Sequence, residues 1–247
     1  MGKEIQLGLI GRKLGHSKSP KIFNQFFDQD GFFNSEYHLI EIEKIEDLKQ
    51  TLTNNFPKLN GFNVTVPFKE DILPYLNEIS PSARAIGAVN TVIVKDNKWC
   101  GFNTDFSGFE DLYNQINHPI SHAIILGSGG SSKTIKAYLK TKNIPYSVVS
   151  RTPQNRQINY SDIHNIPIKQ FVLVINTTPL GMSPNINESA DIPFEKFKEP
   201  NTLIDIIYNP PITRLMQQAK MHDWNCIGGI KMLERQAHDA WKLFKNN

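Results

Sequence analysis

The sequence predicts an α/β fold built from two domains, and three observations support this prediction. Short apolar strands alternate with amphipathic helices from the start of the chain, which favours parallel strand pairing. A glycine-rich loop in the second half stands between a strand and a helix. The length of 247 residues is enough for one large domain or two small ones.

Composition and charge exclude several classes of protein. Hydrophobic residues make up 39% of the chain and charged residues 21%, which is typical of soluble globular proteins. A net charge of +3 with scattered basic residues argues against nucleic-acid binding. Apolar runs such as Ala123–Leu126 and Phe171–Ile175 are too short to cross a membrane. The N-terminus has no signal region, so we expect a cytoplasmic protein. We expect a monomer or a homodimer.

Two cysteines, Cys100 and Cys226, stand far apart without the spacing of a metal site. We expect both thiols to be buried and reduced, and we expect no metal.

In the first half of the chain, turn residues separate the predicted elements. Ser19 before Pro20 predicts a helix start, because a hydroxyl caps the helix and proline suits its first turn. Asp96-Asn97 lies between β-branched runs and predicts a hairpin. The expected strands are Ile5–Ile10, Tyr37–Ile42, Gly61–Val66, Val89–Val94 and Lys98–Phe102; the expected helices are Ser19–Asp30, Ile45–Asn54 and Ile72–Ile79, with helix resuming after Ser80-Pro81.

The amphipathic segment Asp105–Asn117 predicts one helix that leads into a second unit. Strand and helix patterns alternate again beyond it. The expected strands are Ala123–Gly127, Tyr146–Ser150, Phe171–Thr177, Thr202–Tyr208 and Asn225–Ile227, and the expected helices are Lys133–Thr141, Thr213–Lys220 and Ile230–Phe244.

The stretch from Gly61 to Lys69 combines a strand pattern with a polar end. Apolar residues alternate with Asn63 and Thr65, and Pro67 is expected to stop the strand. Lys69 then falls at the start of a segment that reads as a helix from Glu70. A lysine beside a row of amide and hydroxyl groups can form a site, although a solvated loop lysine is the alternative.

The glycine-rich loop predicts a dinucleotide site, because its context is the one in which glycines grip a pyrophosphate. The third glycine of the usual pattern is replaced by Ser132, which is small enough for close packing of the helix on the strand. Helix amides and their partial positive charge favour the phosphates. The predicted phosphate-binding residues are Gly127, Ser128, Gly129, Gly130 and Ser131.

The next predicted strand favours NADP over NAD. An NAD enzyme carries a carboxylate there to bind the ribose hydroxyl, but this strand ends in Ser150-Arg151-Thr152. Arg151, with Arg156 nearby, can hold a 2′-phosphate by charge-assisted hydrogen bonds. The alternative for Arg151 is a solvated loop arginine.

Eight short stretches, spread over nearly the whole chain, occur in the order of a known family. They are Gly8-Leu9-Ile10-Gly11, His16-Ser17-Lys18-Ser19-Pro20, Gly61-Phe62-Asn63-Val64-Thr65-Val66-Pro67-Phe68-Lys69, Ile86-Gly87-Ala88-Val89-Asn90-Thr91, Gly101-Phe102-Asn103-Thr104-Asp105, Asn176-Thr177-Thr178-Pro179-Leu180-Gly181, Asp205-Ile206-Ile207-Tyr208-Asn209-Pro210, and Gly228-Gly229 with Met232-Leu233 and Gln236-Ala237. With these stretches the sequence resembles the shikimate dehydrogenase family. The resemblance implies a substrate-binding domain at 1–104, completed by about 228–247, a Rossmann-like NADP domain at 105–227, and a cleft between them. It implies reversible NADP-linked reduction of 3-dehydroshikimate to shikimate, in aromatic amino-acid biosynthesis.

By motif position, the resemblance makes Lys69 the acid/base group and Asp105 its orienting partner, which also accepts a hydrogen bond from a substrate hydroxyl. A helix N-cap alone is the alternative for Asp105. Two other functions stay open: a quinate/shikimate dehydrogenase that uses NAD, and a catalytically silent sensor of shikimate-like ligands. The resemblance also assigns substrate contacts to Ser17, Ser19, Thr65, Asn90, Tyr208 and Gln236, and cofactor contacts to Ile206 and Gly229.

Overall fold

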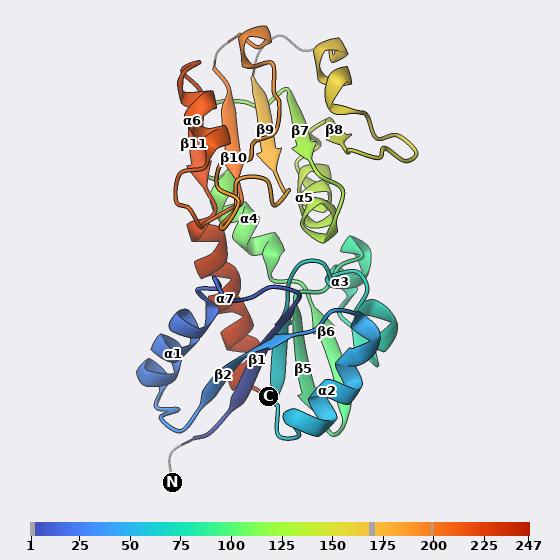
Figure 1. Ribbon diagram of the computed structural model, residues 1–247, viewed down its shortest axis with the longest axis vertical. Coiled ribbons are helices and arrows are strands. Elements are labelled where there is room, and N and C mark those ends of the chain that lie inside the picture. Colours follow the sequence, from blue (N-terminus) through green and yellow to red (C-terminus); the bar gives the residue numbers. More distant parts are fainter. Residues whose placement is uncertain (1–2, 168–170, 199) are drawn as a thin grey trace. The chain divides into compact units, whose positions relative to one another are not determined.

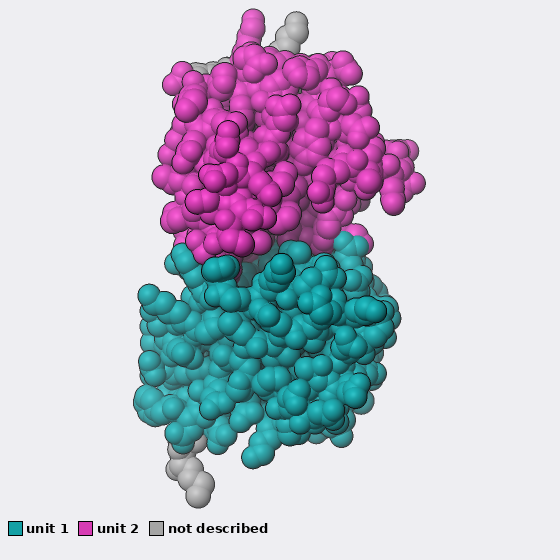
Figure 2. Space-filling view, viewed as in Figure 1, with its two compact units in different colours: residues 1–105, 234–247 teal, residues 106–233 magenta. Residues whose placement is uncertain are grey.

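The computed structural model describes residues 3–167, 171–198 and 200–247 (Figure 1). The chain forms two compact units, shown in two colours in Figure 2. Unit 1 comprises Met1–Asp105 together with Glu234–Asn247, and unit 2 comprises Phe106–Leu233. The chain thus leaves unit 1 once and returns to it with its last helix.

Unit 1 contains a mixed sheet with the strand order β2-β1-β3-β5-β6-β4. The strands β1, β2 and β3 are parallel, whereas β5 runs antiparallel to both β3 and β6. The strands are β1 (Gln6–Gly11), β2 (Glu36–Glu41), β3 (Gly61–Val64), β4 (Glu78–Ile79), β5 (Thr91–Lys95) and β6 (Lys98–Phe102). The helices are α1 (Ser19–Asp30), α2 (Leu48–Asn55, after a 3-10 turn at Ile45–Asp47), α3 (Pro81–Ile86) and α7 (Ile230–Lys245), of which Glu234 onward belongs to this unit.

Helices cover both faces of this sheet. The aromatic side chains of α1 pack with those of α7 on one face, where the Phe27 and Trp241 rings lie 5.4 Å apart at 68°. On the other face, Leu48 and Leu52 of α2 join Ala83 of α3 over Phe62 and the neighbouring strand residues.

Two predictions for unit 1 were wrong in part. Residues 70–79 are not helical: turns lead to a 3-10 segment at Leu73–Tyr75 and then to β4. Pro74 has no N–H for a helical ladder, and the Asn77 N–H bonds instead to the Trp99 carbonyl, 2.9 Å away. Strand pairing is parallel only for part of the sheet. The strand β5 runs antiparallel to β3, and the predicted hairpin at Asp96 and Asn97, both with positive φ, makes β6 antiparallel to β5.

The start of α1 also differs from the prediction. Lys18 occupies the N-cap position, and Ser19 is the first helical residue, with no capping hydrogen bond from the N-cap side chain. The Ser17 hydroxyl accepts the Ser19 N–H at 3.2 Å. Ser17 thus provides a side-chain hydrogen bond at the helix start, which was predicted for Ser19. The Ser19 side chain is buried.

Unit 2 contains a parallel sheet with the order β11-β10-β9-β7-β8. Figure 1 shows these strands side by side with α5 and α6 near them. The helix α4 (Asp105–Tyr113) leads in and ends four residues before the predicted Asn117. The other elements are β7 (His122–Leu126), α5 (Gly130–Thr141), β8 (Tyr146–Val149), β9 (Val172–Asn176), β10 (Thr202–Asp205), α6 (Arg214–Lys220) and β11 (Asn225–Gly228), with 3-10 segments at Tyr160–Asn165 and Phe194–Lys196.

Alternate residues of each central strand in unit 2 enter opposite cores. Ile124 and Leu126 pack on the face that α6 covers, whereas Ala123 and Ile125 pack on the face with α4 and α5. The strands are apolar on both sides, which is the pattern that a parallel sheet covered by helices requires.

In the part of the chain that the structure describes, no helix combines the length and apolarity that a membrane span needs. Within the same ranges, no group of three or more His, Cys, Asp or Glu residues is placed to hold a metal ion. Cys100 and Cys226 are free thiols, and both are half-buried rather than fully buried as predicted.

Candidate active site

One edge of the unit 1 sheet gathers the predicted catalytic residues. Ile10 pairs with Val64, so β1 and β3 end together, and Asn63 pairs with Thr91 where β5 begins. Thr91 also pairs with Phe102, the last residue of β6. The segments that follow β3 and β6, and the one that precedes β5, therefore emerge at the same edge.

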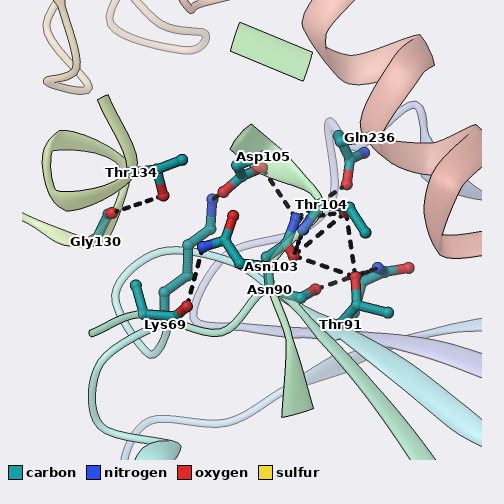
Figure 3. Close-up of polar contacts among 11 residues, drawn as sticks. Lys69, Asn90, Thr91, Asn103, Thr104, Asp105, Gly130, Thr134 and Gln236 are labelled. Carbon is teal, nitrogen blue, oxygen red and sulfur yellow. Dashed lines mark hydrogen bonds and ion pairs between the residues drawn. The ribbon is translucent and has the colours of Figure 1, made fainter. Parts of the chain in front are cut away.

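Lys69 and Asp105 form an ion pair at this edge (Figure 3). The Lys69 Nζ and Asp105 Oδ2 atoms are 2.7 Å apart, and their side chains are only 13% and 6% exposed. The Lys69 carbonyl accepts the Val89 N–H at 2.8 Å, which fixes the backbone that carries the lysine. A pair this well shielded from water interacts far more strongly than a surface pair.

The second oxygen of Asp105 is bound by an amide. Asn90 donates from Nδ2 to Asp105 Oδ1 at 3.0 Å, and the same nitrogen lies 3.3 Å from Gln236 Oε1. Asp105 also opens α4, where the helix dipole favours a carboxylate. Asp105 is the first residue of α4 and the partner of Lys69, so it is not a helix N-cap alone. The structure brings together four of the predicted residues: Lys69, Asn90, Asp105 and Gln236.

Three further predicted substrate residues lie at the same edge of unit 1. Thr65 follows β3, and its N–H bonds to the Ile10 carbonyl at 2.9 Å. Ser17 and Ser19 stand where the loop after β1 enters α1. A Cβ on Gly11 would come within 2.7 Å of the Thr65 methyl group, so glycine lets this loop pass close to Thr65. The remaining candidate, Tyr208, belongs to unit 2, in the segment after β10.

The glycine-rich loop of unit 2 has the geometry that an anion site needs. Gly127 has φ +101°, a conformation that favours glycine, and its own Cβ would meet Thr177 Oγ1 at 2.7 Å. Gly129, by contrast, has no protein atom within 4 Å of an added Cβ, so its backbone is open to a ligand. The 12-residue helix α5 starts at Gly130 and directs its first amides toward this space. Ser132, in place of the third glycine, is fully buried.

The chain reverses its direction of strand addition at β7. It moves from β7 to β8 on one side and to β9, β10 and β11 on the other. Ligands of such sheets bind outside the carboxyl ends of the strands at this switch point. The loop Gly127–Ser131 follows β7 there, so topology and loop geometry indicate the same location.

Arg151 lies beside the glycine-rich loop. Gly127 N–H bonds to the Val149 carbonyl at 2.8 Å, and Arg151 follows two residues later with an exposed side chain. Ser150 is buried, and its hydroxyl accepts the Thr152 N–H at 3.3 Å, which shapes the turn. Burial raises the pKa of Tyr160, and the positive charge of Arg151 opposes that shift.

The predicted cofactor residues Ile206 and Gly229 also lie next to each other at this edge. The Gly229 N–H bonds to the Ile207 carbonyl at 3.1 Å. A Cβ on Gly229 would overlap the carbonyl group of Ile206, so only glycine fits this contact.

Sequence reasoning missed a buried carboxylate in unit 2. Asp205, with no exposed surface, accepts hydrogen bonds from Asn176 Nδ2 at 3.0 Å, the Ile207 N–H at 3.1 Å and Thr213 Oγ1 at 2.7 Å. Burial raises the pKa of Asp205, and these three donors oppose the shift. Asn176 in turn accepts the Thr178 N–H at 3.0 Å, so the network holds two loops of the edge. The sequence signal that could have identified Asp205 was a carboxylate at the end of an apolar strand.

The sequence predicted a row of amide and hydroxyl groups, including Asn63, beside Lys69, but no role for Thr91 and Thr104. Asn63, Thr91 and Thr104 are buried polar residues around Asn90. The available signal was the presence of amide and hydroxyl groups within a strand region that is otherwise apolar.

Comparisons with known proteins agree with this geometry. The family model for the shikimate dehydrogenase substrate binding domain matches residues 9–92. A Clostridium beijerinckii protein named shikimate dehydrogenase (NADP⁺) is 38% identical over 96% of this chain and 91% of its own length. A Staphylococcus epidermidis protein of the same name is 33% identical over 98% of this chain and 92% of its own.

Solved structures give the same result. Shikimate dehydrogenase 1 from Peptoclostridium difficile matches with a TM-score of 0.87 and 33% identity, over 98% of this chain and 92% of that one. The Thermus thermophilus shikimate 5-dehydrogenase in complex with NADP(H) and shikimate matches with a TM-score of 0.83 and 28% identity, over 98% and 94%. On identity and coverage together, this chain belongs to the shikimate dehydrogenase family.

Proposed function

We propose that this protein catalyses the reversible, NADP-linked reduction of 3-dehydroshikimate to shikimate. The observation that carries the proposal is the shielded Lys69–Asp105 ion pair, set among neutral amides and hydroxyls at one sheet edge. A polyhydroxylated substrate requires a site lined by such hydrogen-bonding groups. The names of the family relatives in the comparisons agree with this reaction.

Lys69 and Asp105 would divide the work at the reacting oxygen. Ketone reduction needs a hydride, which bound NADPH supplies, and a proton for the oxygen. The Lys69 ammonium has three N–H donors, and Asp105 Oδ2 binds one of them. We assign to Lys69 the donation of a proton to the carbonyl oxygen during reduction and its acceptance during oxidation. Asp105 orients the ammonium and accepts a hydrogen bond from a neighbouring substrate hydroxyl.

Neutral groups would hold the rest of the substrate. We assign the carboxylate to Ser17 and Ser19, because their hydroxyls stand at the start of α1, where an anion is favoured. Thr65, Asn90 and Gln236 bind the ring hydroxyls from unit 1. We also assign a substrate hydroxyl to the phenol group of Tyr208, and each hydroxyl contact adds discrimination against analogues that lack it.

Unit 2 would hold the cofactor through its exposed edge. The open backbone at Gly129 and the N-terminus of α5 fit a pyrophosphate. Arg151 fits a 2′-phosphate, because a guanidinium offers paired donors to a phosphate dianion. The turn residues Ser150 and Thr152 set its position, and we assign the neighbouring cofactor contacts to Ser128, Gly130, Ser131, Ile206 and Gly229, with Gly127 forming the turn.

The direct test is nicotinamide absorbance during oxidation of shikimate with NADP. We expect turnover by the wild-type protein and a loss of about 100- to 10,000-fold in kcat for Lys69→Ala. The matched control is Lys58→Ala, an exposed lysine of the same unit, for which kcat stays near wild type. Absence of turnover in wild type would refute the activity, and a Lys69→Ala enzyme of normal kcat would refute the role of Lys69.

The cofactor assignment has its own test. Arg151→Ala is expected to raise the KM for NADP about 10- to 100-fold, because a charge-assisted pair is lost, and to leave the KM for NAD nearly unchanged. Equal losses for both cofactors would mean that Arg151 does not read the 2′-phosphate.

A further inference from the structure

The orientation of the Asn90 amide decides whether its NH₂ group or its oxygen faces the Asp105 carboxylate. The backbone N–H of Thr104, which can only donate, points to Asn90 Oδ1 at 2.8 Å. Asn90 Nδ2 consequently faces Asp105 Oδ1 at 3.0 Å. The opposite orientation would set an amide oxygen against a carboxylate and an NH₂ group against an N–H donor. Figure 3 shows the dashed contacts that converge on this amide from Thr91, Thr104 and Asp105.

The buried amide of Asn63 also contacts Asn90. Asn63 Nδ2 donates to the Asn90 carbonyl at 3.2 Å and to Thr91 Oγ1 at 3.1 Å. Since Thr91 Oγ1 accepts this hydrogen bond, its own hydrogen is available for Asn90 Oδ1, 3.2 Å away. Asn63 thus contacts the backbone of Asn90 directly and its side chain through Thr91.

Tyr37 fixes Asn63 in turn. Its phenol hydroxyl donates to Asn63 Oδ1 at 2.8 Å, which leaves the NH₂ group of Asn63 directed at Asn90 and Thr91. Tyr37 lies on β2 and Asn63 on β3, which flank β1, so the tyrosine side chain reaches across the central strand. Its ring stacks on Phe23 with centroids 4.3 Å apart, and its position is therefore set by the core.

We propose that Tyr37, Asn63 and Thr91 are positioning residues that orient the Asn90 amide, and through it the Asp105 carboxylate that pairs with Lys69. Asn63 and Thr91 contact Asn90, and Tyr37 contacts Asn63. They act because the Tyr37 hydroxyl fixes the orientation of the Asn63 amide, and Asn63 and Thr91 both bind Asn90. The catalytic consequence rests on the proposed function, because a displaced carboxylate matters only if Lys69 transfers a proton.

The first test compares Thr91→Val with Thr91→Ser. Valine keeps the shape of threonine and removes the hydroxyl, whereas serine keeps the hydroxyl. We expect Thr91→Val to lower kcat about 5- to 20-fold per folded molecule, to alter the pH profile of kcat, and to leave the KM for NADP unchanged. Thr91→Ser should recover most of kcat. A purely structural threonine would lower the melting temperature of the valine variant without changing kcat or its pH profile.

The second test does not depend on turnover. Hydrogen exchange of the Asn63 and Asn90 side-chain NH₂ groups, followed by NMR in the protein without ligands, is expected to accelerate in Thr91→Val. Tyr37→Phe keeps the stacked ring and removes only the hydroxyl that binds Asn63. This variant tests the same hydrogen-bond network if the valine variant does not fold. We expect faster exchange there too, with a kcat loss of about 2- to 5-fold.

The two readouts separate the two proposals. A wild-type protein without shikimate turnover refutes the proposed function, while the exchange rates still test the network. Faster exchange together with lower kcat supports the positioning role. Unchanged exchange in both variants, or unchanged kcat in an active enzyme, overturns it.

Discussion

Asp105 in unit 1 and Asp205 in unit 2 are both buried carboxylates, and the two are stabilised differently. Asp105 in unit 1 is 4% exposed and pairs with the Lys69 ammonium. Asp205 in unit 2 has no exposed surface and meets three neutral donors: an amide, a hydroxyl and a backbone N–H. The same side chain in similar burial thus has a charged partner in one unit and uncharged partners in the other.

The difference indicates what each carboxylate is for. An ammonium beside a carboxylate creates a pair whose proton can move to a bound ligand, which suits chemistry. Neutral donors satisfy the lone pairs of Asp205 but supply no counter-charge, and burial raises its pKa. Asp205 is suited to fixing the loops around Asn176 and Ile207, and Asp105 to supporting a reaction.

The largest expected effect follows from removing the charged partner. Lys69→Met leaves Asp105 buried without a counter-charge, and we expect the free energy of unfolding in urea to fall by about 3–5 kcal/mol. Lys69→Met combined with Asp105→Asn should recover much of this loss, because no unpaired charge remains. Lys58→Met, at an exposed position, is the control. A double variant no more stable than Lys69→Met would contradict the comparison.

The same chemical change at both carboxylates should have unequal effects on turnover. Asp105→Asn removes the charge that orients Lys69, so we expect kcat for shikimate oxidation to fall about 100-fold, or about 2.7 kcal/mol in the barrier. Asp205→Asn keeps an oxygen for the neighbouring donors, and kcat should stay within about 3-fold of wild type. Equal losses measured in the two variants would remove the distinction between the two sites.

Truncation at Asp205 tests its role in holding loops. Asp205→Ala leaves the Asn176 amide, the Ile207 N–H and the Thr213 hydroxyl without their acceptor, and we expect unfolding to become easier by about 3 kcal/mol. Asp205→Asn should cost less than half as much. Urea titrations of both variants measure this, with Asp191→Ala, an exposed carboxylate of unit 2, as control. Similar costs for alanine and asparagine would argue against the hydrogen bonds.

The smallest expected effect is a pH dependence. Burial raises the folded-state pKa of Asp205 above 3.8, its usual value. The protonated carboxyl therefore makes its full contribution to the free energy of unfolding below pH 3.8. It is lost as pH rises through the folded-state pKa. Wild type should therefore lose stability relative to Asp205→Asn across this interval, by at most about 1.4 kcal/mol per pH unit.

The measurement is the difference in urea unfolding free energy between the two proteins, from about pH 4 to about pH 8. A difference that is constant over the series, or that changes in the opposite direction, would show that Asp205 is not destabilised by burial.

Local patterns in the sequence predicted much of the fold and part of the candidate site. The alternation of strands and helices predicted every strand of unit 2 to within a few residues, because a parallel sheet covered on both faces requires apolar strands. The glycine-rich loop was predicted because Gly127 and Gly129 meet backbone requirements that are local to one turn. The helix predicted from the pattern at residues 70–79 was wrong, because the end of this segment pairs with β6 as the strand β4.

By itself, the sequence determined which chemical groups are available to the site: a lysine after a strand, a carboxylate at a helix start, and a glycine-rich turn. Only the tertiary structure decided which of them meet. Strand register brings Asn63 beside Thr91, and the return of α7 brings Gln236 to Asn90, 146 positions away in the chain. Hydrogen bonds act over about 3 Å, so partners distant in sequence are chosen by packing and register, which no local pattern records.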